Sequence, residues 1–169
     1  GKWHLGLAPH FHPNPRGFDH FYGLLGGGRS YWEDDDQDTD YRRIYRNKIA
    51  EKYEGYLTDV LTDEALKFID LNKNEPFFLY LAYTIPHLKL QVPDLAQYKD
   101  KEWPENMKIQ AAMISRMSRD VGVIAELLES LGLDKNTIIM FSSDNGAHGK
   151  AGTEAFFKPS GKLRGIKRM

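Results

Sequence analysis

Lys2 and His4 are the first residues of this 169-residue sequence whose side chains could do chemistry together. They alternate, so on an extended segment both side chains point to the same face. A lysine supplies a positive charge and a histidine a hydrogen-bond donor, which together suit an oxyanion or a phosphate-like group. The same pair is also common on ordinary protein surfaces, so the spacing leaves both interpretations open.

A second group, Asp144-Asn145-Gly146, places a carboxylate beside an amide oxygen. Hard cations such as Ca²⁺ and Mg²⁺ take oxygen ligands of this kind. Taken alone, the tripeptide is more often only a tight turn. His87, which follows Pro86, is compatible with a structural role as well as a chemical one.

Other polar clusters give weaker indications of a site. His10 and His12 could chelate a metal ion, but no third ligand is obvious in the sequence. A group of cations near the end of the sequence could meet an anion or form a solvated face. These cations are Lys158, Lys162, Arg164, Lys167 and Arg168.

The acidic run over residues 33–40 invites a calcium-loop interpretation. An EF-hand count started at Asp36 puts Tyr41 where glycine is needed and Asn47 where glutamate is needed. The run is therefore expected to be a solvated acidic loop.

Hydrophobic patterning predicts the elements that must position these residues. Helices are expected over residues 56–72 and roughly 106–131, with Gly132 as the C-terminal cap of the second. Continuous apolar runs over residues 77–83 and 137–141 predict strands that are buried on both faces.

The chain is expected to be one domain with three parts. Residues 1–50 are rich in turn formers and predict loops, residues 56–145 form the helix and strand core, and residues 146–169 form a C-terminal loop. The alternation of helices and strands predicts an α/β fold with a mostly parallel sheet flanked by helices.

Ligands bind beyond the carboxyl ends of the strands in open α/β sheets. One predicted strand leads into Pro86-His87 and the other into Asp144-Asn145-Gly146. The topology therefore predicts that His87 and Asp144 emerge at the same edge of the sheet.

Composition excludes several classes of function. The 23 Lys and Arg residues balance 24 Asp and Glu residues, a net charge of -1 that argues against a nucleic-acid partner. With no cysteine, the chain has no disulfide, Cys-ligated zinc or Cys nucleophile of its own. No apolar run reaches the roughly 20 residues needed to span a membrane.

Five strings along the chain, taken in order, resemble type I (formylglycine-dependent) sulfatases of the alkaline phosphatase superfamily. The strings are Gly1-Lys2-Trp3-His4-Leu5-Gly6, Gly17-Phe18-Asp19-His20-Phe21-Tyr22-Gly23, Pro76-Phe77-Phe78-Leu79-Tyr80 leading to Pro86-His87, Ser143-Asp144-Asn145-Gly146, and Leu163-Arg164-Gly165-Ile166-Lys167. The resemblance implies an alkaline phosphatase-like sulfatase core, of which this chain covers the middle.

The same resemblance implies roles for four residues. Lys2 matches the lysine that contacts the sulfate group and the nucleophile, and Lys167 matches the second sulfate-binding lysine. His4 matches the histidine that hydrogen-bonds the formylglycine hydrate and helps to release sulfate. His87 matches the histidine that binds the sulfate ester and is often assigned as the acid that protonates the leaving alcohol.

The resemblance also implies a Ca²⁺ cofactor, with Asp144 and Asn145 as two of its ligands. The family's C/S-x-P-x-R motif, whose Cys or Ser becomes the formylglycine nucleophile, does not occur in this sequence. We therefore expect an internal fragment that is inactive alone and binds Ca²⁺ weakly or not at all. Lys89 departs from the proline that many members have after the histidine.

The expected function is a sulfuric ester hydrolase acting on a sulfated carbohydrate or aryl ester. The alternatives are a phospho-ester hydrolase of the same superfamily, or an inactive fragment that acts as a binding module for sulfated glycans. By resemblance, export to the periplasm, the extracellular space or the lysosome is expected. Exposed sheet edges would make self-association plausible.

Overall fold

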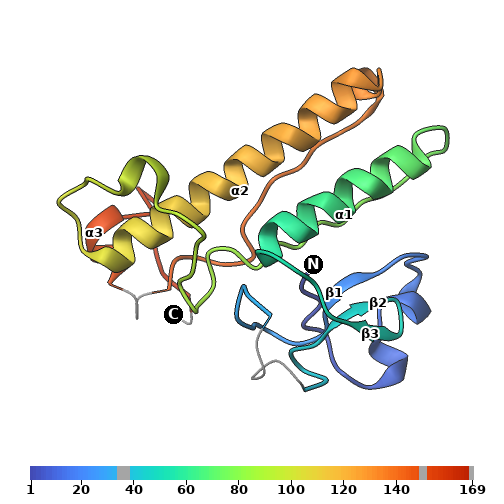
Figure 1. The fold of residues 1–169 in the computed structure, drawn as a ribbon, viewed down its shortest axis with the longest axis horizontal. Coiled ribbons are helices and arrows are strands. Elements are labelled where there is room, and N and C mark those ends of the chain that lie inside the picture. The colour runs from blue at the N-terminus through green and yellow to red at the C-terminus, as the bar shows by residue number, and fades with distance from the viewer. Residues whose placement is uncertain (34–38, 149–151, 168–169) are drawn as a thin grey trace.

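The computed structural model describes residues 1–33, 39–148 and 152–167. Its longest elements are two helices, α1 (Leu57–Asn72) and α2 (Glu105–Ser130), which lie side by side (Figure 1). The shorter elements are β1 (Tyr22–Leu24), β2 (Ile44–Arg46), β3 (Ile49–Glu51) and α3 (Thr153–Phe157). Single turns of 3-10 helix occur at Pro9–Phe11, Asn14–Arg16, Ala96–Tyr98 and Asp134–Asn136.

Both long helices are confirmed close to their predicted bounds. Leu57, Leu61, Ala65 and Ile69 recur every four residues on α1 and are buried, so they give this helix its core-facing side. At the end of α2, Gly132 has the left-handed φ of 69°. The N–H of the next residue bonds to a carbonyl oxygen in the last helical turn at 2.8 Å, as expected for a glycine cap.

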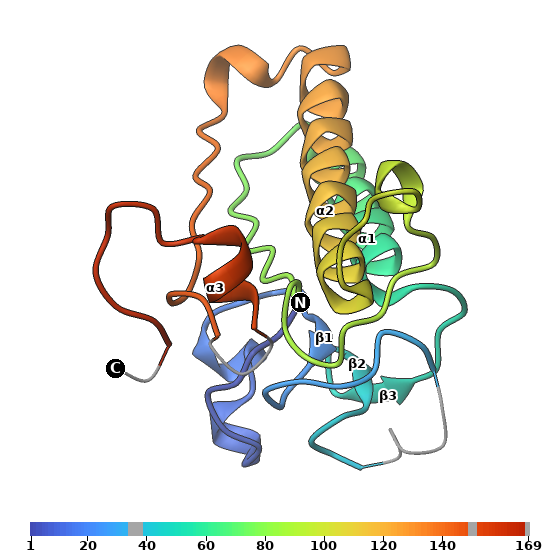
Figure 2. The same ribbon diagram turned by 90° about the vertical axis from the view of Figure 1, so that its left-hand side faces the viewer.

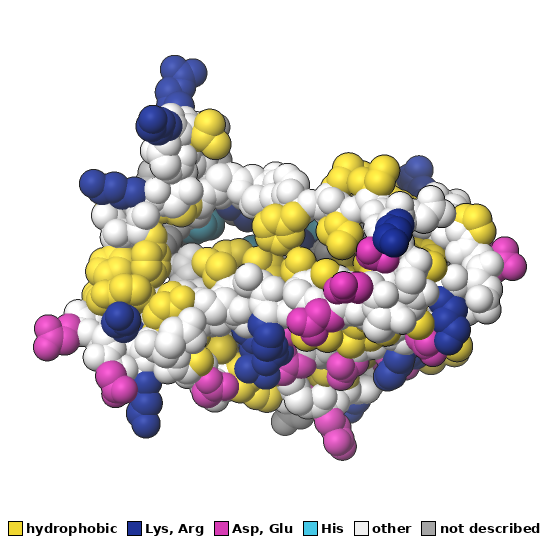
Figure 3. All heavy atoms as spheres, turned by 90° about the horizontal axis from the view of Figure 1, so that it is seen from above, with side chains coloured by type: hydrophobic (Ala, Val, Ile, Leu, Met, Phe, Trp, Pro, Cys, Tyr) yellow, Lys and Arg dark blue, Asp and Glu magenta, His cyan; other side chains and the backbone are white. Residues whose placement is uncertain are grey.

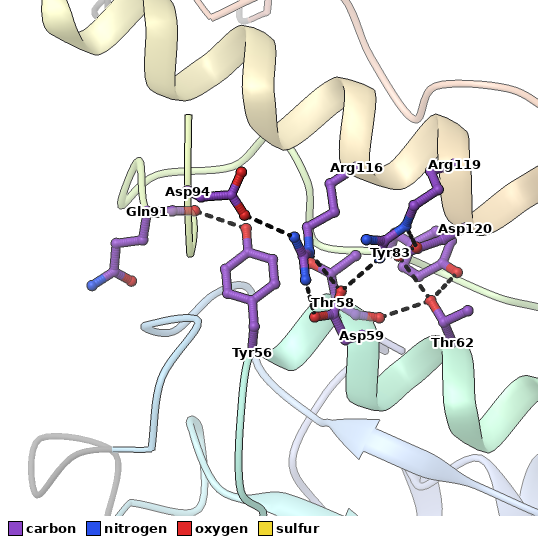
Figure 4. Close-up of polar contacts among 10 residues, drawn as sticks. All are labelled: Tyr56, Thr58, Asp59, Thr62, Tyr83, Gln91, Asp94, Arg116, Arg119 and Asp120. Carbon is purple, nitrogen blue, oxygen red and sulfur yellow. Dashed lines mark hydrogen bonds and ion pairs between the residues drawn. The ribbon is translucent and has the colours of Figure 1, made fainter. Parts of the chain in front are cut away.

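Polar side chains also join the two helices (Figure 4). Asp120 of α2 is buried and accepts hydrogen bonds from Thr62 Oγ1 at 3.1 Å and Arg119 Nε at 2.8 Å. Arg116 Nε donates to Asp59 Oδ1 at 2.7 Å. Because a buried carboxylate without partners would be costly, these contacts specify how α1 and α2 pack.

A small antiparallel sheet with the order β1-β2-β3 lies in the segment predicted to be irregular. Leu24 pairs with Ile44, and both side chains are fully buried. Strands β2 and β3 are joined through Asn47, which has a φ of 53°. The loop prediction missed these strands because three residues are too few to produce a periodic signal.

The predicted parallel sheet is not seen in the described residues. Residues 77–83 and 137–141 are extended segments that return along α1 and α2 (Figures 1 and 2), but neither is a strand. The exposed fractions of Ile138 and Met140 are 86% and 85%, so this run is not buried as predicted. Paired strands lie about 4.8 Å apart and are joined by main-chain hydrogen bonds, and the structure gives these two segments no such bonds to each other.

The core lies between the small sheet and the two helices. Leu24, Ile44, Leu57 and Met113 are among its fully buried apolar residues. The first residues of the chain run beside β1, where Trp3 N donates to Leu24 O at 2.9 Å. None of the described helices combines the length and the apolar character needed to cross a membrane.

Candidate active site

The segment that carries Lys2 and His4 lies between β1 and the run that leads to His87. Lys2 forms an isolated parallel bridge with Leu24, and its N–H donates to Ala82 O at 2.8 Å. His4 leaves the extended conformation, with a φ of 57°. This packing holds the Lys2 segment against both β1 and the run that leads to His87. It therefore brings the predicted anion-binding residues toward His87.

Three successive glycines form the surface on which the two predicted catalytic histidines rest. A Cβ atom placed on Gly27 would lie 2.5 Å from His4 Nε2 and 2.6 Å from Tyr41 Oη. A Cβ atom on Gly28 would lie 3.0 Å from His87 Nδ1. The two rings therefore pack on neighbouring residues of one loop.

His87 is held at three polar positions. Its N–H donates to Thr84 O at 2.9 Å, and its carbonyl oxygen accepts a hydrogen bond from Tyr31 Oη at 3.1 Å. Its Nδ1 lies 2.7 Å from Leu88 O. A carbonyl oxygen only accepts, so the neutral ring carries its proton on Nδ1 and leaves Nε2 available as the site's proton acceptor.

The electrostatic surroundings of His87 bring together three of the predicted site residues. Burial lowers the pKa of His87, and the positive charges of Lys2, Lys167 and His148 lower it further, against the opposing effect of the bond to Leu88. The cluster is therefore rich in positive charge, which favours an anionic ligand. His148 and Tyr41 carry no sequence motif that predicts them near this site.

The chain after Asp144 packs against the segment that carries Lys167. Lys167 N donates to Ala147 O at 2.9 Å. A Cβ atom on Gly146 would lie 3.4 Å from Ile166 Cα. The two terminal strings that resembled sulfatases are therefore neighbours, and through Lys167 they reach the surroundings of His87.

The predicted calcium ligands fit a metal ion in kind but not in number. Asn145 Nδ2 donates to Asp144 Oδ1, while Asn145 Oδ1 is buried and has no hydrogen-bond partner. An unpartnered amide oxygen beside a carboxylate suits a hard cation. Within the described residues, however, no three His, Cys, Asp or Glu side chains form a metal-binding group, and Ca²⁺ usually takes 6–8 oxygens.

His12, a candidate metal ligand with His10, has a structural role. His12 is buried, with Nε2 2.7 Å from Asn47 O and Nδ1 accepting a hydrogen bond from Asn14 N, so it is a structural histidine. Most of the acidic run, residues 34–38, lies outside the described residues. Of the five terminal cations, Arg168 also lies outside them.

Seen from above, the molecule is hollowed across its middle, and histidine atoms are visible within the hollow (Figure 3). Apolar side chains line much of the rim.

The model of the Sulfatase family matches residues 1–167. The chain belongs to the sulfatase family. An arylsulfatase of Klebsiella aerogenes is 30% identical to this sulfatase chain, over 88% of the chain and 44% of the relative. An N-acetylgalactosamine-6-sulfatase of Mus musculus is 31% identical, over 87% of the chain and 30% of the relative.

A solved structure is also similar to this sulfatase chain. The crystal structure of Ps i-CgsB is 40% identical, with a TM-score of 0.78, over 86% of this chain and 36% of that one. The same match is found for Ps i-CgsB in complex with k-i-k-neocarrahexaose. The chain spans less than half the length of these relatives, and the family resemblance read from the five strings is confirmed.

Proposed function

We propose that this chain is the central part of a sulfuric ester hydrolase, which removes sulfate from a sulfated carbohydrate or an aryl ester. The observation that carries the proposal is that Lys2 and Lys167 lie close enough to His87 for their charges to lower the pKa of its ring. The family match supports sulfate as the anion, and the oligosaccharide complex of Ps i-CgsB supports a carbohydrate substrate.

Lys2 and Lys167 bind the sulfuryl oxygens in this proposal. Sulfuryl transfer places negative charge on those oxygens and on the leaving oxygen. Two ammonium groups stabilise that charge best in a site from which part of the water is excluded. Their joint effect on the pKa of His87 supports their placement around the same ligand.

His87 is the general acid. The bond from Nδ1 to Leu88 O leaves Nε2 as the nitrogen that carries the transferable proton in the charged ring. When the sulfate ester binds, its negative charge stabilises the charged imidazole. As the S–O bond to the alcohol breaks, Nε2 gives its proton to the leaving oxygen and the ring becomes neutral.

His4 serves the second half of the reaction. In the scheme implied by the resemblance, a formylglycine residue from outside this segment would supply the nucleophile. His4 would accept a proton from that residue when sulfate is released.

Asp144 and Asn145 would supply two of the oxygen ligands of a Ca²⁺ ion. The bound ion would contribute positive charge to the site. The buried, unpartnered Asn145 Oδ1 supports this role. The remaining ligands would come from outside this segment, as would the nucleophile.

Export of the intact protein stays a prediction from the family resemblance.

A second candidate is a binding module for sulfated glycans without turnover. It is favoured by the absence of cysteine and of a Ser-x-Pro-x-Arg string in these 169 residues, which leaves a cationic cluster without its nucleophile. A phospho-ester hydrolase, the remaining alternative, would use the same cationic groups for a phosphate.

The test assays the chain, the intact protein and its His87→Gln variant on two sulfate esters. One ester has a nitrophenol leaving group and the other an alkyl alcohol. We expect turnover by the intact protein alone, and a loss in the variant of roughly 10²–10⁴-fold on the alkyl ester, with a much smaller loss on the nitrophenyl ester. Turnover of the matching phosphate esters in preference to both sulfates would contradict the proposal.

A further inference from the structure

Two segments that are far apart in the sequence meet at His87. The glycine loop is defined as residues 26–31 and the histidine segment as residues 84–91. Gly28 of the glycine loop lies against the His87 ring, and Tyr31 of the same loop donates from Oη to the His87 carbonyl oxygen at 3.1 Å. The ring and the main chain of His87 therefore rest on one loop.

Gln91 joins the same two segments at a second point. Its Oε1 accepts one hydrogen bond from Ser30 Oγ at 3.1 Å and another from Tyr31 N at 2.9 Å. Its main-chain oxygen accepts a third from Tyr56 Oη at 2.7 Å (Figure 4). Gln91 thus connects the histidine segment both to the glycine loop and to Tyr56, the residue before α1.

Residues of the two helices and the residue before α1 hold this connection in place. The rings of Tyr31 and Tyr56 are stacked, with centroids 5.3 Å apart and an interplanar angle of 20°, and Tyr31 is only 1% exposed. The Arg116 guanidinium also lies 5.6 Å from the Tyr56 ring centroid while it is paired with Asp59. Buried stacked rings of this kind move little, so they provide a fixed reference for the loop.

The contacts between the glycine loop and the histidine segment set the direction of His87 Nε2, the ring nitrogen that is available for chemistry. The N–H, the carbonyl oxygen and Nδ1 of His87 are held by Thr84, Tyr31 and Leu88. A shift of the glycine loop would move both the surface beneath the ring and the donor to the carbonyl. Either change would turn Nε2 away from its present direction.

We propose that Tyr31 and Gln91 are positioning residues, which hold the glycine loop against the histidine segment and so fix the tautomer and direction of the His87 ring. The catalytic meaning of this inference rests on the proposed sulfatase function. The geometric part concerns only contacts within this chain, so it can be tested without turnover.

Four variants test the positioning role. Tyr31→Phe keeps the stacked ring and removes the hydroxyl that donates to His87 O. Gln91→Leu removes the shared acceptor, and Gln91→Glu restores an acceptor for the same two donors. The matched control is Tyr98→Phe, which loses a comparable 2.8 Å bond to Ser115 Oγ without touching either segment.

The first measurement is long-range ¹H–¹⁵N NMR of His87 in the 169-residue chain at pH 8, with thermal unfolding to verify that each variant is folded. We expect a single Nδ1-protonated tautomer in the wild type, Gln91→Glu and Tyr98→Phe. Tyr31→Phe and Gln91→Leu should show a mixture of tautomers. If Gln91→Leu does not fold, Tyr31→Phe decides.

The second measurement is the rate of alkyl sulfate hydrolysis by the intact protein carrying the same changes. Misplacing a catalytic group by about 1 Å costs up to roughly 10²-fold, so we expect kcat of Tyr31→Phe to fall roughly 10-fold to 100-fold. KM should change by less than about twofold, because the sulfate-binding lysines are untouched.

The two measurements separate the possible failures. An unchanged His87 tautomer in both Tyr31→Phe and Gln91→Leu, or an equal disturbance in Tyr98→Phe, would overturn the positioning role. Absence of turnover in the intact wild type would instead overturn the proposed function, and the NMR result would still decide the positioning role.

Discussion

Replacing Gly27 with alanine should disturb the site while leaving the fold intact. The added Cβ atom would lie 2.5 Å from His4 Nε2 and 2.6 Å from Tyr41 Oη. Both atoms are the ends of exposed side chains, which can turn away at little cost to packing. We therefore expect the free energy of unfolding to change by no more than about 1 kcal/mol.

The displacement of His4 sets the size of the functional effect. Its ring must retreat by about 0.9 Å to restore the 3.4 Å of an ordinary van der Waals contact. An error of about 1 Å in the place of a catalytic group costs up to roughly 10²-fold in rate, equivalent to about 2.7 kcal/mol. The kcat of the intact protein should fall by about that factor in Gly27→Ala.

Two neighbouring glycine substitutions calibrate this result. Gly26→Ala places Cβ 2.1 Å from the main-chain oxygen of Tyr41, which cannot turn away, so it should destabilise the chain by about 1–3 kcal/mol. Gly122→Ala in α2 meets nothing within 4 Å and should stabilise the chain by about 0.5–1 kcal/mol. Chemical denaturation measures all three changes.

Two results for Gly27→Ala would refute this reasoning. Unchanged His4 NMR resonances and an unchanged kcat in Gly27→Ala would show that His4 does not rest on the glycine surface. A loss of stability as large as that of Gly26→Ala would show that the contact is structural and that the His4 ring is not free to move.

Three further predictions concern stability and metal binding. Burial is the largest cause of the lowered pKa of both His20 and His87, so the unfolded chain binds more protons than the folded chain as the pH passes through their ordinary pKa of about 6.5. The melting temperature should therefore rise with pH across this range, and a flat or falling profile would contradict the burial of these groups. Asp120→Ala removes the acceptor shared by Thr62 and Arg119 and should cost about 1–3 kcal/mol by denaturant titration, whereas a neutral result would show that the buried network does not hold α1 to α2. Calorimetric titration of the chain with Ca²⁺ should show weak binding or none, because only two oxygen ligands are in place, and sub-micromolar affinity would indicate a site elsewhere.

The helices could be predicted from the sequence because their signal is local. Apolar residues at a spacing of three and four place a helix whatever surrounds it, and Gly132 marks the end of α2 by its own backbone preference. The prediction that the apolar runs at residues 77–83 and 137–141 are buried strands was wrong. Whether such a run becomes a strand depends on a partner elsewhere, which periodicity does not specify.

Site residues could be predicted only where the residue type and its string indicate a chemical role. Lys2, His87 and Lys167 stood in strings that resemble a family, and the structure brings their charges together. Tyr41 and His148 were missed because their relevance comes from tertiary contacts. The run of three glycines near residue 27 was the available signal, since closely packed rings leave no room for a side chain.

The exposed apolar runs bear on the association of this chain with itself. Phe78, Ile138, Met140 and Phe141 are each at least 70% exposed. Exposed extended segments with free main-chain groups pair readily with other chains. Self-association stays a prediction, which sedimentation across a range of concentrations would test.

The central claim is that the positive cluster around His87 is a sulfate site, and its most direct test is a sulfate titration followed at the His87 ring by NMR. Sodium chloride at equal ionic strength is the control, since simple screening would act on any charged surface. The account predicts that sulfate raises the pKa of His87 toward or above its ordinary value of about 6.5, and that Lys2→Ala and Lys167→Ala each weaken the response. A His87 pKa that sulfate moves no further than chloride does would contradict the account.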